Sequence, residues 1–161
     1  MNAPISEFRM PRYKEIPNVG LYLEQTIKYI NESLAPLQVS VTPSMVSNYV
    51  KLGYIQRPVK KQYYADQIAY LIFAVLAKQV LSLEHITVLF DLQRKTFSVD
   101  VAYNFFCTEL EEMLCYLFGE RSEPPLASED EPAAKKTLRS VVTAISHIIY
   151  LSRRFEELKN G

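Results

Sequence analysis

Apolar residues recur at helical spacing through most of the chain, and this periodicity predicts an all-α protein. A first helix is expected over residues 19 to 35, with Asn18 as a candidate N-cap and Pro36 as a stop. Its apolar stripe consists of Leu23, Ile27, Ile30 and Leu34. A stripe of this width is typical of a helix that buries one face against a core.

A second, shorter helix is predicted from Pro43 to Leu52. Thr42 is its candidate N-cap, and Pro43 suits the first helical position, where its missing N–H costs nothing. Gly53 follows in the position where a left-handed residue usually ends a helix. The apolar face is formed by Met45, Val46, Tyr49, Val50 and Leu52. The opposite face carries Ser44, Ser47, Asn48 and Lys51.

Four further segments of the chain show helical periodicity. The segment from Asp66 to about Leu81 is apolar nearly all round, which predicts a helix at the centre of the protein. Ser82 is the candidate cap of the next helix, which is expected to end near Leu92. Two more helices are predicted over residues 99 to 118 and 134 to 159. The acidic, proline-rich stretch 120–132 between them is predicted to be a loop.

The remaining N-terminal segment, residues 1–17, contains three prolines and is predicted to be an extended arm. Two interpretations are open for it. Its apolar residues favour packing over the core, and its basic residues allow a reach towards DNA. The chain therefore divides into an arm (1–17), a helical domain (18–95) and a C-terminal helical region (96–161) that includes the acidic loop 120–132.

The last helix allows two interpretations as well. Its apolar positions persist at spacings of three and four, but doubled positions such as Ile148 and Ile149 make the stripe broader than a coiled-coil seam. One face is expected to complete the monomer core, and a second is available to a partner. We expect a homodimer through the C-terminal helices.

Charge is distributed unevenly along a chain that is neutral overall, with 18 basic and 18 acidic residues among 161. No acidic residue lies between Ser33 and Ala65, whereas Lys51, Arg57, Lys60 and Lys61 do. A local positive patch on a neutral protein suits a polyanion that touches one face. The longest apolar run has ten residues, too few to span a bilayer, and no signal peptide is visible, so a cytoplasmic protein is expected.

Catalytic and metal-binding patterns are not found. Cys107 and Cys115 lie about 12 Å apart along a helix, too far for a disulfide, and the two histidines have no neighbouring ligands. No phosphate-binding glycine motif or catalytic triad motif is present. We expect neither an enzyme nor a metal or cofactor site. Several aromatic residues between Tyr103 and Phe118 could line an effector pocket, although at helical spacing core packing is the more common role.

Residues 41–55, VTPSMVSNYVKLGYI, resemble without gaps the helix-turn-helix of the MerR family of regulators, whose pattern is roughly VSVDTIRYYERIGLL. Residues 61–68, KQYYADQI, resemble the wing and the helix that follows it. The resemblance implies a winged helix-turn-helix whose second helix enters the major groove. It aligns Tyr49 with the second tyrosine of the family's pair and Lys61 with the wing arginine. Ser47 and Asn48 stand where the family usually has arginine and tyrosine.

A narrower resemblance covers the chain up to about Phe118. The motifs that carry it are Met10-Pro-Arg-Tyr, Leu21-Tyr-Leu-Glu-Gln, the segment 42–53, and residues 67–83. They are similar to those of a family of small bacterial proteins of unknown function with a MerR-like helix-turn-helix. That family supplies an expected fold and no activity.

These observations favour a DNA-binding transcriptional regulator, in which helix 43–52 lies in the major groove and the basic wing 57–63 contacts the phosphate backbone. The candidate DNA-binding residues are Ser44, Ser47, Asn48, Tyr49, Lys51, Arg57, Lys60, Lys61 and Tyr63. The alternative is a protein-binding adaptor that keeps the helix-turn-helix shape without DNA binding. The departures at Ser47 and Asn48 motivate that alternative.

Overall fold

The structure is a computed structural model that describes residues 5–161, and it is mostly helical, as the periodicity predicted. Its α-helices are α1 (Leu23–Leu34), α2 (Pro43–Lys51), α3 (Ala65–Ala77), α4 (Leu83–Thr96), α5 (Val99–Leu117) and α6 (Ala133–Asn160). Short 3-10 turns occur at η1 (Ile5–Glu7), η2 (Tyr13–Glu15) and η3 (Ala35–Leu37). Two short strands, β1 (Leu21–Tyr22) and β2 (Gln62–Tyr63), pair antiparallel.

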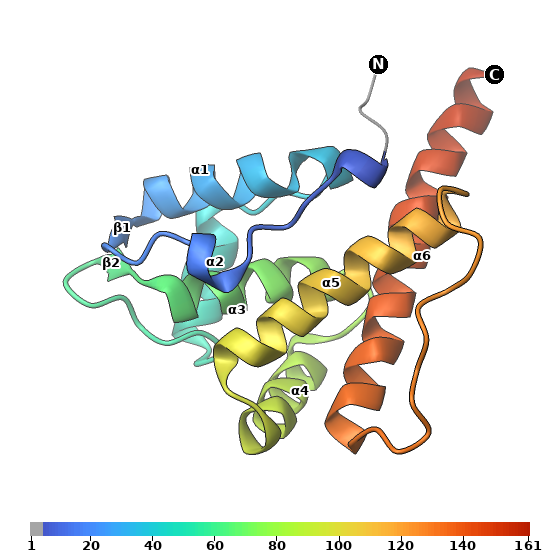
Figure 1. Ribbon diagram of the computed structural model, residues 1–161. Helices are drawn as coiled ribbons and strands as arrows, with labels where there is room; N and C mark the ends of the chain where they lie inside the picture. The colour runs from blue at the N-terminus through green and yellow to red at the C-terminus, as the bar shows by residue number, and fades with distance from the viewer. Residues whose placement is uncertain (1–4) are drawn as a thin grey trace.

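Helix α3 lies at the centre of the molecule (Figure 1). Helix α1 crosses above it, α5 passes in front of it, and α4 lies below. Helix α6 packs along α5, and its C-terminal end projects beyond the other helices. The turn between α2 and β2 lies at the opposite end of the molecule from α6.

The prediction that the helix starting near Asp66 is central is confirmed by its burial. Every residue of α3 except Asp66 and Tyr70 is buried. One hydrophobic cluster extends from Ile5 through α3 to Ile149, so residues 18–95 and 96–161 share a core. Because the core is shared, α5 and α6 determine the position of α3 as much as α1 does.

The first helix begins later than the periodicity predicted. Residues Leu21 and Tyr22 pair with Tyr63 and Gln62 in the small sheet, which takes the start of the expected helix into extended conformation. Gly20 precedes them with a φ of +89°, and a Cβ there would lie 2.9 Å from the Gln62 side-chain oxygen. Asn18, expected to cap this helix, instead accepts a hydrogen bond from the Ala65 N–H at the start of α3. Asn18 caps α3 and not α1 because a tertiary contact brings the arm next to a helix that is distant in sequence.

The N-terminal arm packs on the core, and the interpretation that it reaches towards DNA is not supported for residues 5–17. Phe8, Met10 and Ile16 are buried. The Arg12 guanidinium donates to both carboxylate oxygens of Glu111 on α5, at 2.7 and 3.0 Å. Two three-residue 3-10 turns, η1 and η2, interrupt the arm that was expected to be extended. The part of the arm before Ile5 lies outside the described residues.

A buried charge cluster joins α5, the acidic loop and α6. The Arg139 guanidinium of α6 donates to the carboxylates of Glu109 and Glu131. Burial raises the pKa of Glu109 above its usual value, whereas the hydrogen bond from Arg139 lowers the pKa of Glu131. The loop 120–132 contains no helix or strand, as predicted, and it lies at the end of the molecule away from β2 (Figure 1). No helix in the described part of the chain is long and apolar enough to cross a membrane.

Candidate nucleic-acid interface

Helix α2 begins and ends where the local signals predicted. The Thr42 hydroxyl accepts a hydrogen bond from the Met45 N–H at 3.2 Å, which confirms Thr42 as the N-cap. Gly53 follows the helix with a φ of +81°, and the N–H groups of Tyr54 and Ile55 both donate to the Tyr49 carbonyl. This left-handed turn directs the chain away from α2.

The two faces of α2 differ as expected. Val46 and Tyr49 are buried against the core, and Ser44, Ser47 and Asn48 are exposed with Lys51. Leu52 is an exception, because it was expected on the apolar face and is 51% exposed. The chain turns at Gly53, and Ile55 occupies the buried position instead. The outward face of α2 is therefore polar and uncharged along one turn, with a cation at its C-terminal end.

The basic segment after α2 forms a tight hairpin, the wing hairpin, spanning residues 57–63. Val59 and Gln62 exchange two backbone hydrogen bonds of 3.0 and 2.9 Å. The two residues between them, Lys60 and Lys61, have φ of +51° and +65°. Positive φ at both central residues is the pattern of a type I′ turn, which normally uses Asn-Gly. Two lysines therefore occupy the tip in a left-handed backbone conformation that is unfavourable for residues with a Cβ.

Helix α2 is held in place by the side chain of Asn31 on α1. Its amide donates to the Val41 carbonyl at 3.0 Å, and its oxygen accepts from the Val41 N–H at 2.7 Å. Val41 immediately precedes the N-cap Thr42. The pair of bonds therefore determines where α2 starts relative to α1.

The wing hairpin is held by Gln67 on α3, which is 6% exposed. Its amide nitrogen donates to the carbonyls of Gln56 and Arg57 at 3.1 and 2.9 Å. Its oxygen accepts from the Tyr64 N–H at 2.8 Å, at the start of α3. One buried side chain thus joins the approach to the hairpin and its exit.

We expect Gln67→Leu to lower the free energy of unfolding by about 2 kcal/mol, because three part-buried backbone groups lose their hydrogen-bond partner. Urea denaturation measures this change. The matched control is Gln25→Leu, since Gln25 is exposed and accepts a single bond from the Tyr22 N–H. A loss of about 0.5 kcal/mol is expected for the control. Equal losses in the two variants would contradict the role assigned to Gln67.

Two of the predicted DNA-binding residues are buried. Tyr49 is 1% exposed and Tyr63 is 5% exposed, so neither ring can reach a phosphate in this conformation. Burial raises the pKa of both phenols. Tyr49 fills the contact between α2 and the core, and Tyr63 pairs with Leu21 in the small sheet. Their expected contacts to DNA are corrected to structural roles.

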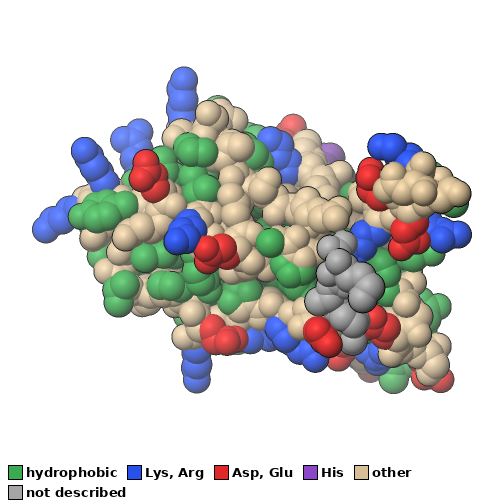
Figure 2. All heavy atoms as spheres, turned by 90° about the horizontal axis from the view of Figure 1, so that it is seen from above, with side chains coloured by type: hydrophobic (Ala, Val, Ile, Leu, Met, Phe, Trp, Pro, Cys, Tyr) green, Lys and Arg blue, Asp and Glu red, His purple; other side chains and the backbone are tan. Residues whose placement is uncertain are grey.

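The other seven predicted residues form one exposed set on α2 and the wing hairpin. These are Ser44, Ser47, Asn48, Lys51, Arg57, Lys60 and Lys61. Four of them are cations, namely Lys51, Arg57, Lys60 and Lys61, and among residues 5–161 no ion pair involves any of these four. Figure 2 shows Lys and Arg side chains projecting from the end of the molecule that carries the hairpin. Unpaired cations on one end leave a positive potential there.

No group of three or more His, Cys, Asp or Glu side chains that could hold a metal occurs within the described range 5–161. Cys107 and Cys115 are free thiols. Burial raises the pKa of Cys107 to about 12, which keeps this thiol protonated and unreactive at neutral pH.

Comparison with known proteins assigns the chain to a family by sequence. Residues 11–106 match the model of a domain of unknown function, DUF1836. The chain belongs to this family, which confirms the expected membership of a family of unknown function. The matched range includes α1, α2, the wing hairpin, α3 and α4. Searches of curated proteins and of solved structures found no match.

Proposed function

We propose that this protein is a sequence-specific DNA-binding regulator that inserts α2 into the major groove and lays the wing hairpin on the phosphate backbone. The observation that carries the proposal is the exposed polar face of α2 beside a hairpin whose cations lack partners within the described residues. A protein with this function would act in the cytoplasm.

The proposal treats α1, α2 and the hairpin as a MerR-like winged helix-turn-helix. Three features support this assignment. Helix α2 is short and follows α1 after a brief connection, the hairpin comes directly after α2, and β1 pairs with the second strand of the hairpin. The hydrogen bonds of Asn31 and Gln67 hold α2 and the wing hairpin against the core. A DNA-binding surface needs such rigid support.

The turn at the hairpin tip supports a role for its two lysines. A left-handed residue other than glycine or asparagine costs about 1–2 kcal/mol. An Asn-Gly tip would avoid most of this cost. Lys60 and Lys61 supply two adjacent charges at the most projecting point of the hairpin. Such unfavourable backbone conformations are common at functional sites, and phosphate contact is the function that adjacent lysines serve best.

On α2 the side chains divide between bases and backbone. Asn48 is suited to a paired contact with adenine, and Ser44 and Ser47 accept or donate to several bases. Lys51, at the end of the helix, is positioned with Arg57 to neutralise phosphates. Four cations per subunit imply that the logarithm of affinity falls with the logarithm of salt concentration at a slope of about −3.6.

A second copy of the chain is part of the proposal. Leu151, Phe155 and Leu158 are exposed on the end of α6 that projects beyond the bundle. Pairing through these residues would give a homodimer, which reads two half-sites about one helical turn apart. Sedimentation at micromolar concentration, compared with a Phe155→Glu variant, tests the pairing. A monomeric wild-type protein would contradict it.

The alternative, a protein-binding adaptor, has one observation in its favour. Val19, Leu52 and Val59 are exposed apolar side chains, at 80%, 51% and 59%. Residues of this kind near the hairpin would suit a protein partner better than a phosphate backbone.

An NMR titration distinguishes the two functions. Duplex DNA from upstream of the protein's own gene is added to the isotope-labelled full chain. DNA binding through the proposed surface is expected to shift the amides of Ser47, Asn48, Lys60 and Lys61, and to leave the acidic loop 120–132 unchanged. No shift at low salt, or shifts confined to other surfaces, would contradict the proposal and favour the adaptor.

A further inference from the structure

Gln93 on α4 contains a buried hydrogen-bond acceptor that has no partner. The side chain is 8% exposed, and its amide nitrogen donates to the Ala134 carbonyl at 2.8 Å. The Ala134 carbonyl can only accept a hydrogen bond, so the Gln93 group that faces it must be the NH2 group. The positions of the oxygen and nitrogen in the Gln93 amide are therefore unambiguous. The amide oxygen of Gln93 is therefore the atom without a hydrogen bond. Leaving such an atom buried without a donor costs free energy.

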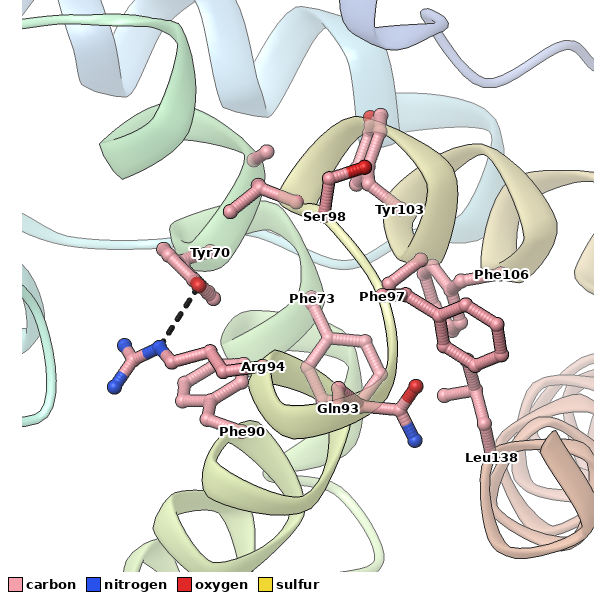
Figure 3. A pocket seen from close by; sticks show the side chains of 13 residues that line it. Tyr70, Phe73, Phe90, Gln93, Arg94, Phe97, Ser98, Tyr103, Phe106 and Leu138 are labelled. Atoms are coloured by element: carbon pink, nitrogen blue, oxygen red, sulfur yellow. Dashed lines mark hydrogen bonds between the residues drawn. The ribbon is translucent and has the colours of Figure 1, made fainter. Parts of the chain in front are cut away.

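This amide lines a pocket between α3, α4, α5 and α6. The pocket contains about 460 Å³ of space not filled by protein atoms, part of it open to solvent. Its walls are mainly aromatic and aliphatic and include Phe73, Phe90, Phe97, Phe106 and Leu138. Figure 3 shows the Gln93 amide between Phe73 and Leu138, with its oxygen directed towards Phe97.

The charges around the pocket limit the kind of ligand. Arg94 is the one charged residue among those that line it, and its Nε donates to the Tyr70 hydroxyl at 3.0 Å. The guanidinium also lies over the Tyr70 ring, 4.9 Å from its centroid, at the edge of the pocket. No carboxylate lines the pocket, so a cationic ligand has no counterion there. Aromatic walls favour a flat apolar ligand through edge and face contacts.

We propose that this pocket binds a small neutral aromatic molecule with one N–H or O–H group, which donates a hydrogen bond to the Gln93 amide oxygen. Phenols and indoles are the chemical class. The ring fills the space between Phe73, Phe106 and Leu138, and the donor satisfies the Gln93 oxygen, which the fold leaves without a partner. This inference does not depend on DNA binding.

Matched ligand pairs test the hydrogen bond directly. Phenol is compared with toluene, and indole with indene, so that each pair differs in the donor and hardly in shape. Dissociation constants come from shifts of the Ala102 and Phe106 amides in the isotope-labelled full chain. The same four ligands are titrated into Gln93→Met, which keeps the side-chain length and removes the acceptor.

We expect Gln93→Met to lose the preference of the pocket for the ligand that carries the hydrogen-bond donor. Within each pair, the ratio of the two dissociation constants is expected to shift by about tenfold between wild type and Gln93→Met, because one hydrogen bond is lost. The ratio cancels the different hydration of the two ligands. Ala102→Leu fills the pocket and is expected to weaken all four ligands by at least about tenfold. Gln56→Leu, an exposed glutamine away from the pocket, is expected to change neither quantity.

Two results would overturn the proposal. One is the absence of saturable shifts at pocket residues for all four ligands. The other is an unchanged ratio in a folded Gln93→Met, whatever the effect of Ala102→Leu, because the ligand would then make no hydrogen bond to the Gln93 oxygen. If Gln93→Met does not fold, Ala102→Leu and the wild-type titrations still decide whether the pocket is the binding site.

Discussion

Replacement of Arg139 by methionine is expected to lower the free energy of unfolding by about 3 kcal/mol near neutral pH. Arg139 donates to Glu109 and Glu131, and both of these carboxylates are largely buried. Methionine keeps much of the side-chain volume and removes the charge. The loss arises because the Glu109 carboxylate stays in the protein interior without a counterion. Urea denaturation of wild type and variant measures the difference.

The difference in the free energy of unfolding between wild type and Arg139→Met is expected to depend on pH. Burial already raises the pKa of Glu109, and the loss of Arg139 removes the charge that opposes this effect. A raised pKa in the folded state means that folding binds a proton, so acid favours the folded variant. The pKa of Glu131 is lowered in the wild type, and the stability this gives is lost as the pH falls below the ordinary value of 4.5. Both effects make the deficit shrink towards acid.

The control for this prediction is Lys28→Met, because Lys28 pairs with Glu32 on the exposed face of α1 at 3.9 Å. A change below about 1 kcal/mol is expected, with little dependence on pH. A deficit of Arg139→Met that stayed constant from neutral to acid pH would contradict the account, since it would point to lost packing and not to an unpaired carboxylate.

The double variant Lys60→Asn/Lys61→Gly is expected to stabilise the fold and weaken DNA binding at the same time. Asn-Gly suits the type I′ turn, so the free energy of unfolding should rise by about 1–2 kcal/mol. Two phosphate contacts are removed, so the salt slope of DNA binding should become shallower by about 1.8. Denaturant unfolding and fluorescence anisotropy with duplex DNA measure the two effects.

The variant Lys60→Ala/Lys61→Ala separates charge from backbone strain. It removes the same charges but keeps residues with a Cβ at both positive-φ positions. We expect the same loss of salt slope and no gain in stability. If both double variants bound DNA with the wild-type slope, the hairpin would not contact phosphates, and the proposed interface would be wrong.

Local signals predicted the parts of the candidate site that depend on neighbouring residues. Thr42, Pro43 and Gly53 define the ends of α2 through capping and backbone conformation, and these effects act within a few residues. The segregation of Ser44 and Asn48 from Val46 follows from helical geometry alone. Both features were therefore visible in the sequence.

The features that depend on tertiary contacts were not predictable. Burial of Tyr49 agrees with its expected place on the apolar face of α2, whereas burial of Tyr63 depends on packing against the core, which an amphipathic side chain in isolation does not indicate. The roles of Asn31 and Gln67 depend on partners 10 and 11 residues away, with no motif to identify them. Among the aromatics considered for a pocket, Tyr103 and Phe106 line the one described, but Phe73 and Gln93 come from other helices. The sequence of a single helix does not indicate a pocket whose walls come from four helices.

Fluorescence anisotropy with specific and scrambled DNA tests the central claim most directly. The protein is titrated against a duplex from upstream of its own gene and against a scrambled duplex of equal length, at low and near-physiological salt. The account predicts tighter binding to the upstream duplex that persists at the higher salt, with about 1–3 kcal/mol of that preference lost in Asn48→Ala. Equal binding to both duplexes that disappears with salt, or no binding at low salt, would contradict it.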